Sequence, residues 1–132
     1  MSGRTRLSFV ALLLPWLGQA SAGEEPLPQV WQQARERGVV LRAVGNEPGW
    51  LLELDGEGRA LLTTDYGNWR RSFTVTSTGN GTDFTAVIDG EPFHSTFATT
   101  TCSDTMSDRV YSLRVTVTLG DRTFHGCGFD LR

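Results

Sequence analysis

From Val39 to the end of the chain, apolar and polar residues alternate, and this period of two constrains the fold more than any other feature. The longest alternating run extends from Tyr111 to Leu119, where Leu113, Val115 and Val117 are separated by arginine and threonine. Such alternation is typical of β-strands that have one buried face and one face in contact with water. The chain is therefore predicted to be rich in β-strands.

Tight-turn sequences separate the alternating segments. Asp55-Gly56, Asn80-Gly81, Asp89-Gly90 and Gly120-Asp121 supply the positive φ angles that short hairpin turns need. The pattern predicts about eight strands, at 39–45, 49–55, 59–64, 69–77, 82–88, 91–98, 109–119 and 121–130. Consecutive hairpins without a crossover helix predict an antiparallel meander. We expect an all-β fold, a small up-and-down β-barrel, because closure removes exposed edges; a two-sheet sandwich is the alternative.

The first 22 residues have the three parts of a secretory signal peptide. Arg4 and Arg6 precede an apolar run from Leu7 to Leu17, which is followed by small residues at Ala20 and Ala22. A membrane-spanning helix needs about 20 apolar residues, and this run is much shorter. We therefore expect cleavage after Ala22, a periplasmic or secreted protein, and no stable insertion into the membrane.

Cleavage would leave an acidic chain. It removes two arginines and no acidic residue, which leaves 10 basic and 15 acidic residues and a net charge of −5. A nucleic-acid-binding domain or a protein of anionic membrane surfaces would need a basic stripe. The composition therefore argues against both of these partners.

The expected mature chain divides into a leader with a short helix, 23–38, and a barrel domain, 39–132. Val30, Trp31 and Ala34 have helical spacing between Leu27 and Gly38, and the glycine can end a helix. We expect Val30 and Trp31 to pack over one end of the domain.

Two cysteines, Cys102 and Cys127, remain after cleavage. An even number of cysteines in an exported protein favours a disulfide. Closing a loop of about 26 residues would stabilise the fold by roughly 3.5 kcal/mol in the chain-entropy model. We therefore expect a Cys102–Cys127 disulfide.

Two segments interrupt the alternation and are candidate binding sites. The first is Gly45–Trp50, where Asn46 and Glu47 beside Trp50 could form a polar and aromatic spot at the barrel mouth. The alternative is a shaped turn whose Trp50 enters the core.

The second is the polar segment from Thr99 to Asp108, because loops of ten residues between hairpin strands often have a function. Its alternative role is to let Cys102 reach its partner. The candidate binding residues of this segment are Asp104, Met106, Ser107 and Asp108.

The chemical motifs do not favour an enzyme or a metal protein. Cys102, Met106, His125 and Cys127, with His94, form a soft ligand set that suits copper, but an oxidised cysteine pair cannot supply thiolates. The chain has no G-x-S-x-G nucleophile elbow and no phosphate-binding loop. We predict no catalytic residue, no metal site and no cofactor.

The interrupting segments also carry a resemblance. Gly45-Asn46-Glu47-Pro48-x-Trp50 together with Cys102-x-Asp104-x-Met106-Ser107-Asp108 and Gly126-Cys127 resembles an uncharacterised family of small bacterial envelope proteins, predicted membrane proteins or lipoproteins. The resemblance implies an exported β domain with that disulfide and implies no known activity. This chain lacks the lipidation cysteine and has a single Cys127 where a pair is common. More loosely, it is similar to the eight-stranded periplasmic inhibitors of c-type lysozyme, whose lysine-bearing inhibitory loop is not recognisable here.

The resulting functional prediction is a non-catalytic binding or inhibitor module of the cell envelope, with an envelope protein or a lysozyme as its partner. The alternatives are periplasmic copper handling and a small-ligand carrier. A carrier needs an open barrel, and five large apolar side chains could instead fill it: Phe73, Phe84, Phe93, Phe97 and Leu113.

Overall fold

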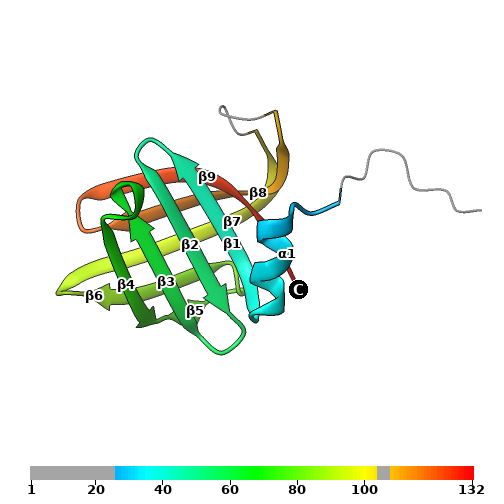
Figure 1. Ribbon diagram of the computed structural model, residues 1–132. Helices are drawn as coiled ribbons and strands as arrows, with labels where there is room; N and C mark the ends of the chain where they lie inside the picture. Colours follow the sequence, from blue (N-terminus) through cyan, green and yellow to red (C-terminus); the bar gives the residue numbers. More distant parts are fainter. Residues whose placement is uncertain (1–25, 104–107) are drawn as a thin grey trace, which may run out of the picture.

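The computed structural model describes residues 26–103 and 108–132, and these residues form a nearly closed β-barrel preceded by one short helix (Figure 1). The elements in chain order are α1 (Gln29–Glu36), β1 (Val39–Asn46), β2 (Gly49–Asp55), β3 (Arg59–Thr64), the 3-10 turn η1 (Asp65–Gly67), β4 (Trp69–Thr74), β5 (Thr76–Thr78), β6 (Asp83–Ile88), β7 (Glu91–Ser103), β8 (Val110–Leu119) and β9 (Arg122–Asp130). The predicted signal peptide, 1–22, lies outside the described residues, as do Asp104, Met106 and Ser107. The described part contains no helix that is long and apolar enough to cross a membrane.

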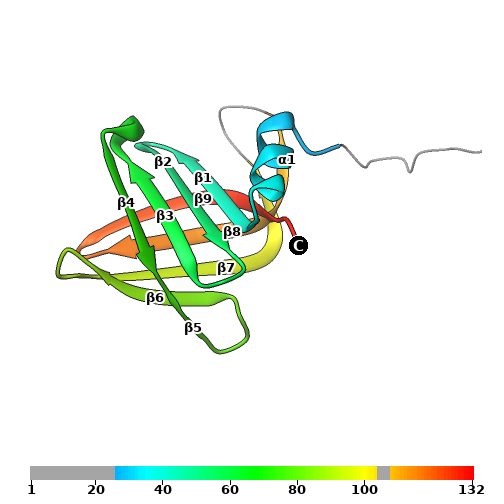
Figure 2. The same ribbon diagram turned by 60° about the horizontal axis from the view of Figure 1, so that its bottom comes forward.

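The strands form one antiparallel sheet in the order β4-β3-β2-β1-β9-β8-β7-β6-β5. The predicted antiparallel barrel with a short preceding helix is confirmed. The segment that we predicted as one strand, 69–77, is divided at Val75. β4 pairs with β3 as far as Thr74, the N–H of Val75 donates to the carbonyl oxygen of Gly58 at 2.8 Å, and β5 then pairs with β6. One continuous segment therefore changes its partner and brings the two ends of the sheet together (Figure 2).

The barrel interior holds the main core. Inward residues from β1, β2, β3, β6, β7, β8 and β9 are buried there, and Phe73 of β4 and Phe84 of β6 pack against them. Phe73 meets Phe93 edge to face with ring centroids 4.9 Å apart, and Phe84 meets Phe97 in the same way at 5.9 Å. All five side chains that we expected to fill the barrel belong to this core or pack against it, which argues against the carrier alternative.

A second cluster lies outside the barrel wall, beneath α1. Figure 1 shows α1 against the outside of the barrel, next to β1. Trp31 of α1 packs against Tyr111 of β8 and Phe129 of β9, with ring centroids 5.7 and 5.2 Å apart. Ala34, one helical turn later, is also buried. The expected packing is right for Trp31 and wrong for Val30, which is 48% exposed. A helix of eight residues turns only one narrow face towards the wall, and Val30 lies beside that face.

Three charged side chains connect α1 to the outer face of β1 and β2. Arg42 and Arg37 donate to the carboxylate of Glu53 at 2.9 and 3.1 Å, and the Arg42 guanidinium stacks 4.5 Å from the Trp31 ring centroid. Burial by itself raises the pKa of Glu53, but the hydrogen bonds and charges of both arginines outweigh it, and the pKa is lowered. The carboxylate is therefore held ionised, paired and almost completely buried.

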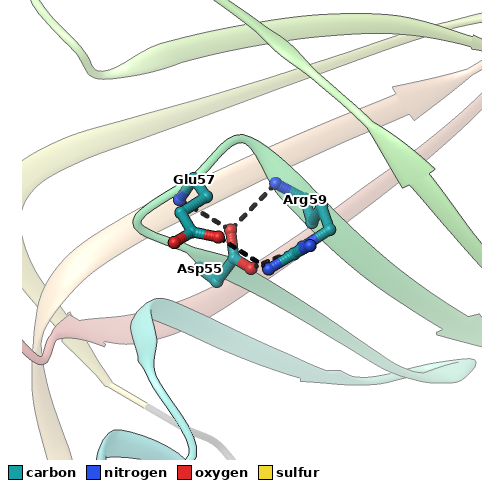
Figure 3. A network of polar contacts seen from close by, with 3 residues as sticks. All are labelled: Asp55, Glu57 and Arg59. Carbon is teal, nitrogen blue, oxygen red and sulfur yellow. Dashed lines mark hydrogen bonds and ion pairs between the residues drawn. The ribbon is translucent and has the colours of Figure 1, made fainter.

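In the β2–β3 turn, exposed charged side chains find their hydrogen-bond and ion-pair partners within the turn itself (Figure 3). The Asp55 carboxylate accepts the N–H groups of Glu57 and Arg59 at 2.8 and 2.9 Å, and the Arg59 side chain donates to both acids. The backbone hydrogen bond from Arg59 is the main reason that the pKa of Asp55 is lowered. This network shapes a hairpin turn and leaves the charges in solvent.

Candidate functional site

A hollow on the outer barrel wall joins the two segments that interrupt the strand pattern. It has a volume of ≈ 460 Å³, and we call it the disulfide hollow. Its lining residues are Val44, Gly45, Asn46, Glu47, Cys102, Ser103, Arg114, His125, Gly126 and Cys127. The fold thus brings Glu47 and Cys102, distant in the sequence, into the lining of one surface feature.

The first wall is the end of β1 and its turn, shaped by a buried tryptophan. Trp50 is 4% exposed in the barrel core, and its Nε1 donates to the carbonyl oxygen of His125 at 3.2 Å. A Cβ atom at Gly45 or Gly126 would overlap with the indole ring, so both glycines make room for it. Trp50 therefore enters the core, as the alternative interpretation of this segment predicts. Asn46 and Glu47 remain at the surface.

A tyrosine that sequence reasoning missed supports the same turn from the other side. The hydroxyl of Tyr66 donates to the carbonyl oxygen of Asn46 at 3.3 Å, and its ring lies against Gly49. Asp65 beside it pairs with Arg122 of β9 at 3.2 Å, and the hydrogen bond from Arg122 is the main cause of the lowered pKa of Asp65. A tyrosine in a surface turn gives no sequence signal for this role, since the contact spans 20 residues.

The second wall is the end of β7, where our loop prediction is partly wrong. Thr99–Ser103 belongs to β7, which continues through a bulge after Thr99 and pairs Cys102 with Tyr111 and Ser103 with Val110. The extra bulge residue changes which side chains face outward, and the threonines of this segment fit a strand as well as a loop. Asp108 is exposed in a bend before β8. Asp104, Met106 and Ser107 lie outside the described residues.

The predicted disulfide is confirmed and forms the floor of the hollow. Cys102 and Cys127 are joined with their Cα atoms 5.6 Å apart, and both are buried in the outer cluster. Cys127 lies on β9, which pairs with β1 and β8, while Cys102 lies on β7. The disulfide therefore fastens the end of the β7–β8 hairpin to the barrel wall.

Three charged or titratable side chains surround this floor. Arg114 and His125 lie on the outer faces of β8 and β9, because their strand neighbours Val115 and Phe124 point into the core. The Arg114 guanidinium donates to the carbonyl oxygen of Thr101 at 3.4 Å, and Glu47, which is exposed, also lines the hollow. The hollow thus offers a cation, an anion and an imidazole to a polar partner. Sequence reasoning missed Arg114, although its place opposite Cys127 follows from the predicted hairpin.

The second histidine is not part of this hollow. His94 lies on β7 with its Nε2 3.8 Å from a carboxylate oxygen of Asp83 and 3.5 Å from the hydroxyl of Thr96. In the described ranges, 26–103 and 108–132, no three His, Cys, Asp or Glu side chains are grouped as metal ligands. The proposed copper set is thus divided: His94 lies apart, both cysteines are oxidised, and Met106 is outside the described residues.

Comparison of the chain with protein-family models, with curated proteins and with solved structures gives no match.

Proposed function

We propose that this protein is a non-catalytic binding module of the cell envelope and that its partner docks at the disulfide hollow. The observation that carries the proposal is the convergence of the Asn46–Glu47 turn with the Cys102–Ser103 end of β7 around one hollow. Binding residues are commonly carried by irregular segments that a rigid scaffold positions.

Specific tertiary contacts support the segments that line the hollow. Trp50 and Tyr66 support the β1–β2 turn, and the Cys102–Cys127 disulfide fixes the end of β7. A site that is ordered before binding loses less conformational entropy when the partner arrives. Rigid walls therefore favour a recognition surface over a passive connection.

The chemistry of the hollow suits ion pairs and hydrogen bonds. Glu47 and Arg114 carry opposite charges in its lining, and His125 adds a group that can donate or accept. The sulfur atoms at its floor are oxidised and offer no thiolate nucleophile. We infer that a protein surface with charged side chains is the ligand, and a lysozyme-type enzyme is one version of it.

The cellular setting is part of the proposal. The signal-peptide pattern of residues 1–22 and the disulfide both fit an exported, periplasmic protein. The resemblance of the Gly-Asn-Glu-Pro-x-Trp and Cys-x-Asp-x-Met-Ser-Asp segments to small envelope proteins supports the same location.

The test is quantitative capture from a periplasmic extract of the source organism. The immobilised oxidised protein is compared with a Glu47→Gln, Arg114→Gln variant and with a control, Glu57→Gln, Arg35→Gln, that changes the same charges at exposed positions outside the hollow and the remaining strand edges. We expect one or a few proteins to be retained by the wild type and the control and lost by the hollow variant. Equal retention by all three proteins would refute the hollow as the docking site.

The lysozyme version has its own measurement. Stoichiometric protein should lower the muramidase activity of a purified c-, g- or i-type lysozyme, and the hollow variant should relieve the inhibition. If none of the three enzyme types is inhibited, the partner belongs to another class.

A further inference from the structure

The barrel carries a second surface, at the place where its sheet is not closed by hydrogen bonds. β4 is the last strand at one end of the sheet and pairs only with β3. β6 pairs with β7 along its whole length but with β5 only at Asp83–Thr85. Two strand edges therefore have no strand partner within the described residues. They are the edge of β4 away from β3 and the edge of Ala86–Ile88 away from β7.

These two edges lie near each other and border a hollow. Its volume is ≈ 690 Å³, and its lining comes from β4, β5 and β6: Phe73, Thr74, Thr76, Thr85, Ala86 and Val87. We call this hollow and its two strand edges the seam. Figure 2 shows β4 continuing into β5, which lies beside β6, so the seam is closed by the chain at Val75.

An exposed ion pair crosses the seam away from Val75. The Nε of Arg71 on β4 lies 2.9 Å from the carboxylate of Asp89, in the β6–β7 turn. Both side chains are about half exposed, and an ion pair in solvent contributes only about 0–1 kcal/mol. This contact therefore bridges the edges without preventing another chain from separating them.

We propose that the seam binds an extended segment of a partner polypeptide, which adds as a strand along the free edge of β4 and contacts β6. Free strand edges present rows of N–H and C=O groups that recruit an additional strand. The added strand would extend the sheet at β4, where the ladder of the described strands ends. This surface is separate from the disulfide hollow, so the inference goes beyond the proposed function.

The side chains of the seam indicate the chemistry of that segment. Val87 is 71% exposed on the outer face of β6. Arg70 is exposed on the outer face of β4, and no hydrogen bond or ion pair holds its side chain among the described residues. Inward positions of an added strand would meet Phe73 and Ala86. The partner segment should therefore alternate apolar residues, facing inward, with outward residues that include an acid beside Arg70.

The experiment selects ten-residue random peptides, displayed on phage, against the oxidised wild-type protein. The enriched peptides are synthesised and titrated into ¹⁵N-labelled protein. We expect an alternating apolar pattern with at least one acidic residue, and shifts confined to the amides of Trp69–Thr74 and Ala86–Ile88. Methylation of alternate peptide nitrogens should abolish binding, because it removes the ladder hydrogen bonds.

The matched variants are Arg70→Glu, Val87→Glu at the seam and Glu47→Gln, Arg114→Gln at the disulfide hollow. Both seam positions are exposed, so the seam variant should keep the fold, which the ¹⁵N spectrum confirms directly. The seam variant should bind at least about tenfold more weakly, because it opposes like charges, and the hollow variant should bind as the wild type does. The proposal is overturned if no peptide is enriched, if shifts lie elsewhere, if the N-methylated peptide still binds, or if ultracentrifugation shows a wild-type dimer that the seam variant dissociates.

Discussion

The two sides of this barrel are held together in different ways. On the β9–β1 side, α1, an aromatic cluster and the Cys102–Cys127 disulfide cover the outer wall. On the β4–β6 side, the sheet ends in two free edges that an exposed ion pair bridges. A barrel of this size can therefore concentrate its extra stabilisation on one wall. The docking site that we propose lies on the covered wall, and the strand addition that we propose lies at the seam.

The largest effect should come from removing the aromatic anchor of the covered wall. Trp31→Ala should lower the free energy of unfolding by about 3–5 kcal/mol, because it leaves a cavity between Tyr111 and Phe129. Val30→Ala, one residue earlier in the same helix, should change it by no more than about 0.5 kcal/mol. Urea denaturation measures both. Similar losses in the two variants would mean that α1 does not pack as described.

The second-largest loss in the free energy of unfolding should come from removing the disulfide. Cys102→Ala, Cys127→Ala should lower the free energy of unfolding by about 3.5 kcal/mol, since the crosslink closes a loop of 25 residues in sequence separation. Hydrogen exchange should show faster opening of the β7–β8 end than of β2 and β3. A uniform change over the whole barrel would show that the disulfide does not serve the covered wall in particular.

The buried carboxylate beneath α1 should give a smaller, pH-dependent effect. Glu53→Gln should cost about 2 kcal/mol near neutral pH, because Arg42 is left buried without its anion while Arg37 remains half exposed. The pKa of Glu53 is lowered in the fold from 4.5. Its contribution is therefore complete above the unfolded-state pKa and is lost as pH falls through the lower folded-state value.

A series of denaturation curves between neutral pH and about pH 3 measures this contribution. The difference between wild type and Glu53→Gln should shrink as the solution is acidified below about pH 4. A difference that stays constant or grows on acidification would contradict the ionised, paired carboxylate.

The smallest effect belongs to the seam. Arg71→Gln removes the ion pair with Asp89 and should change the free energy of unfolding by less than about 1 kcal/mol. The amides of β4 and Ala86–Ile88 should nevertheless exchange faster in the variant. A loss as large as that of the disulfide variant would mean that the seam is part of the stabilised wall.

The strands could be predicted because their signals are local. The alternation from Tyr111 to Leu119 and turns such as Asp55-Gly56 place β8 and the β2–β3 hairpin without knowledge of the rest of the chain. The end of β7 could not be placed in the same way. Its bulge after Thr99 breaks the alternation, and a run of polar threonines predicts a loop where the structure has a strand.

The candidate site was harder to predict than the fold because its parts meet only after the barrel forms. Asn46, Glu47 and the cysteines stood out from the pattern, and the hollow contains all four. Arg114 and Tyr66 were missed, since an outward arginine and a turn tyrosine carry no local signal. The sequence left open whether Trp50 lies at the surface or in the core. Its burial depends on the small size of Gly45 and Gly126, which lie on two different strands.

The most direct test of the account is site-specific photo-crosslinking in living cells of the source organism. A photoreactive residue replaces Glu47 at the hollow or, as a matched control, Glu57 in the β2–β3 turn. We expect a light-dependent adduct with one discrete envelope protein from position 47, lost when Arg114→Gln is added, and no such adduct from position 57. The account is contradicted if position 47 yields no adduct in exported, oxidised protein, or if both positions yield the same one.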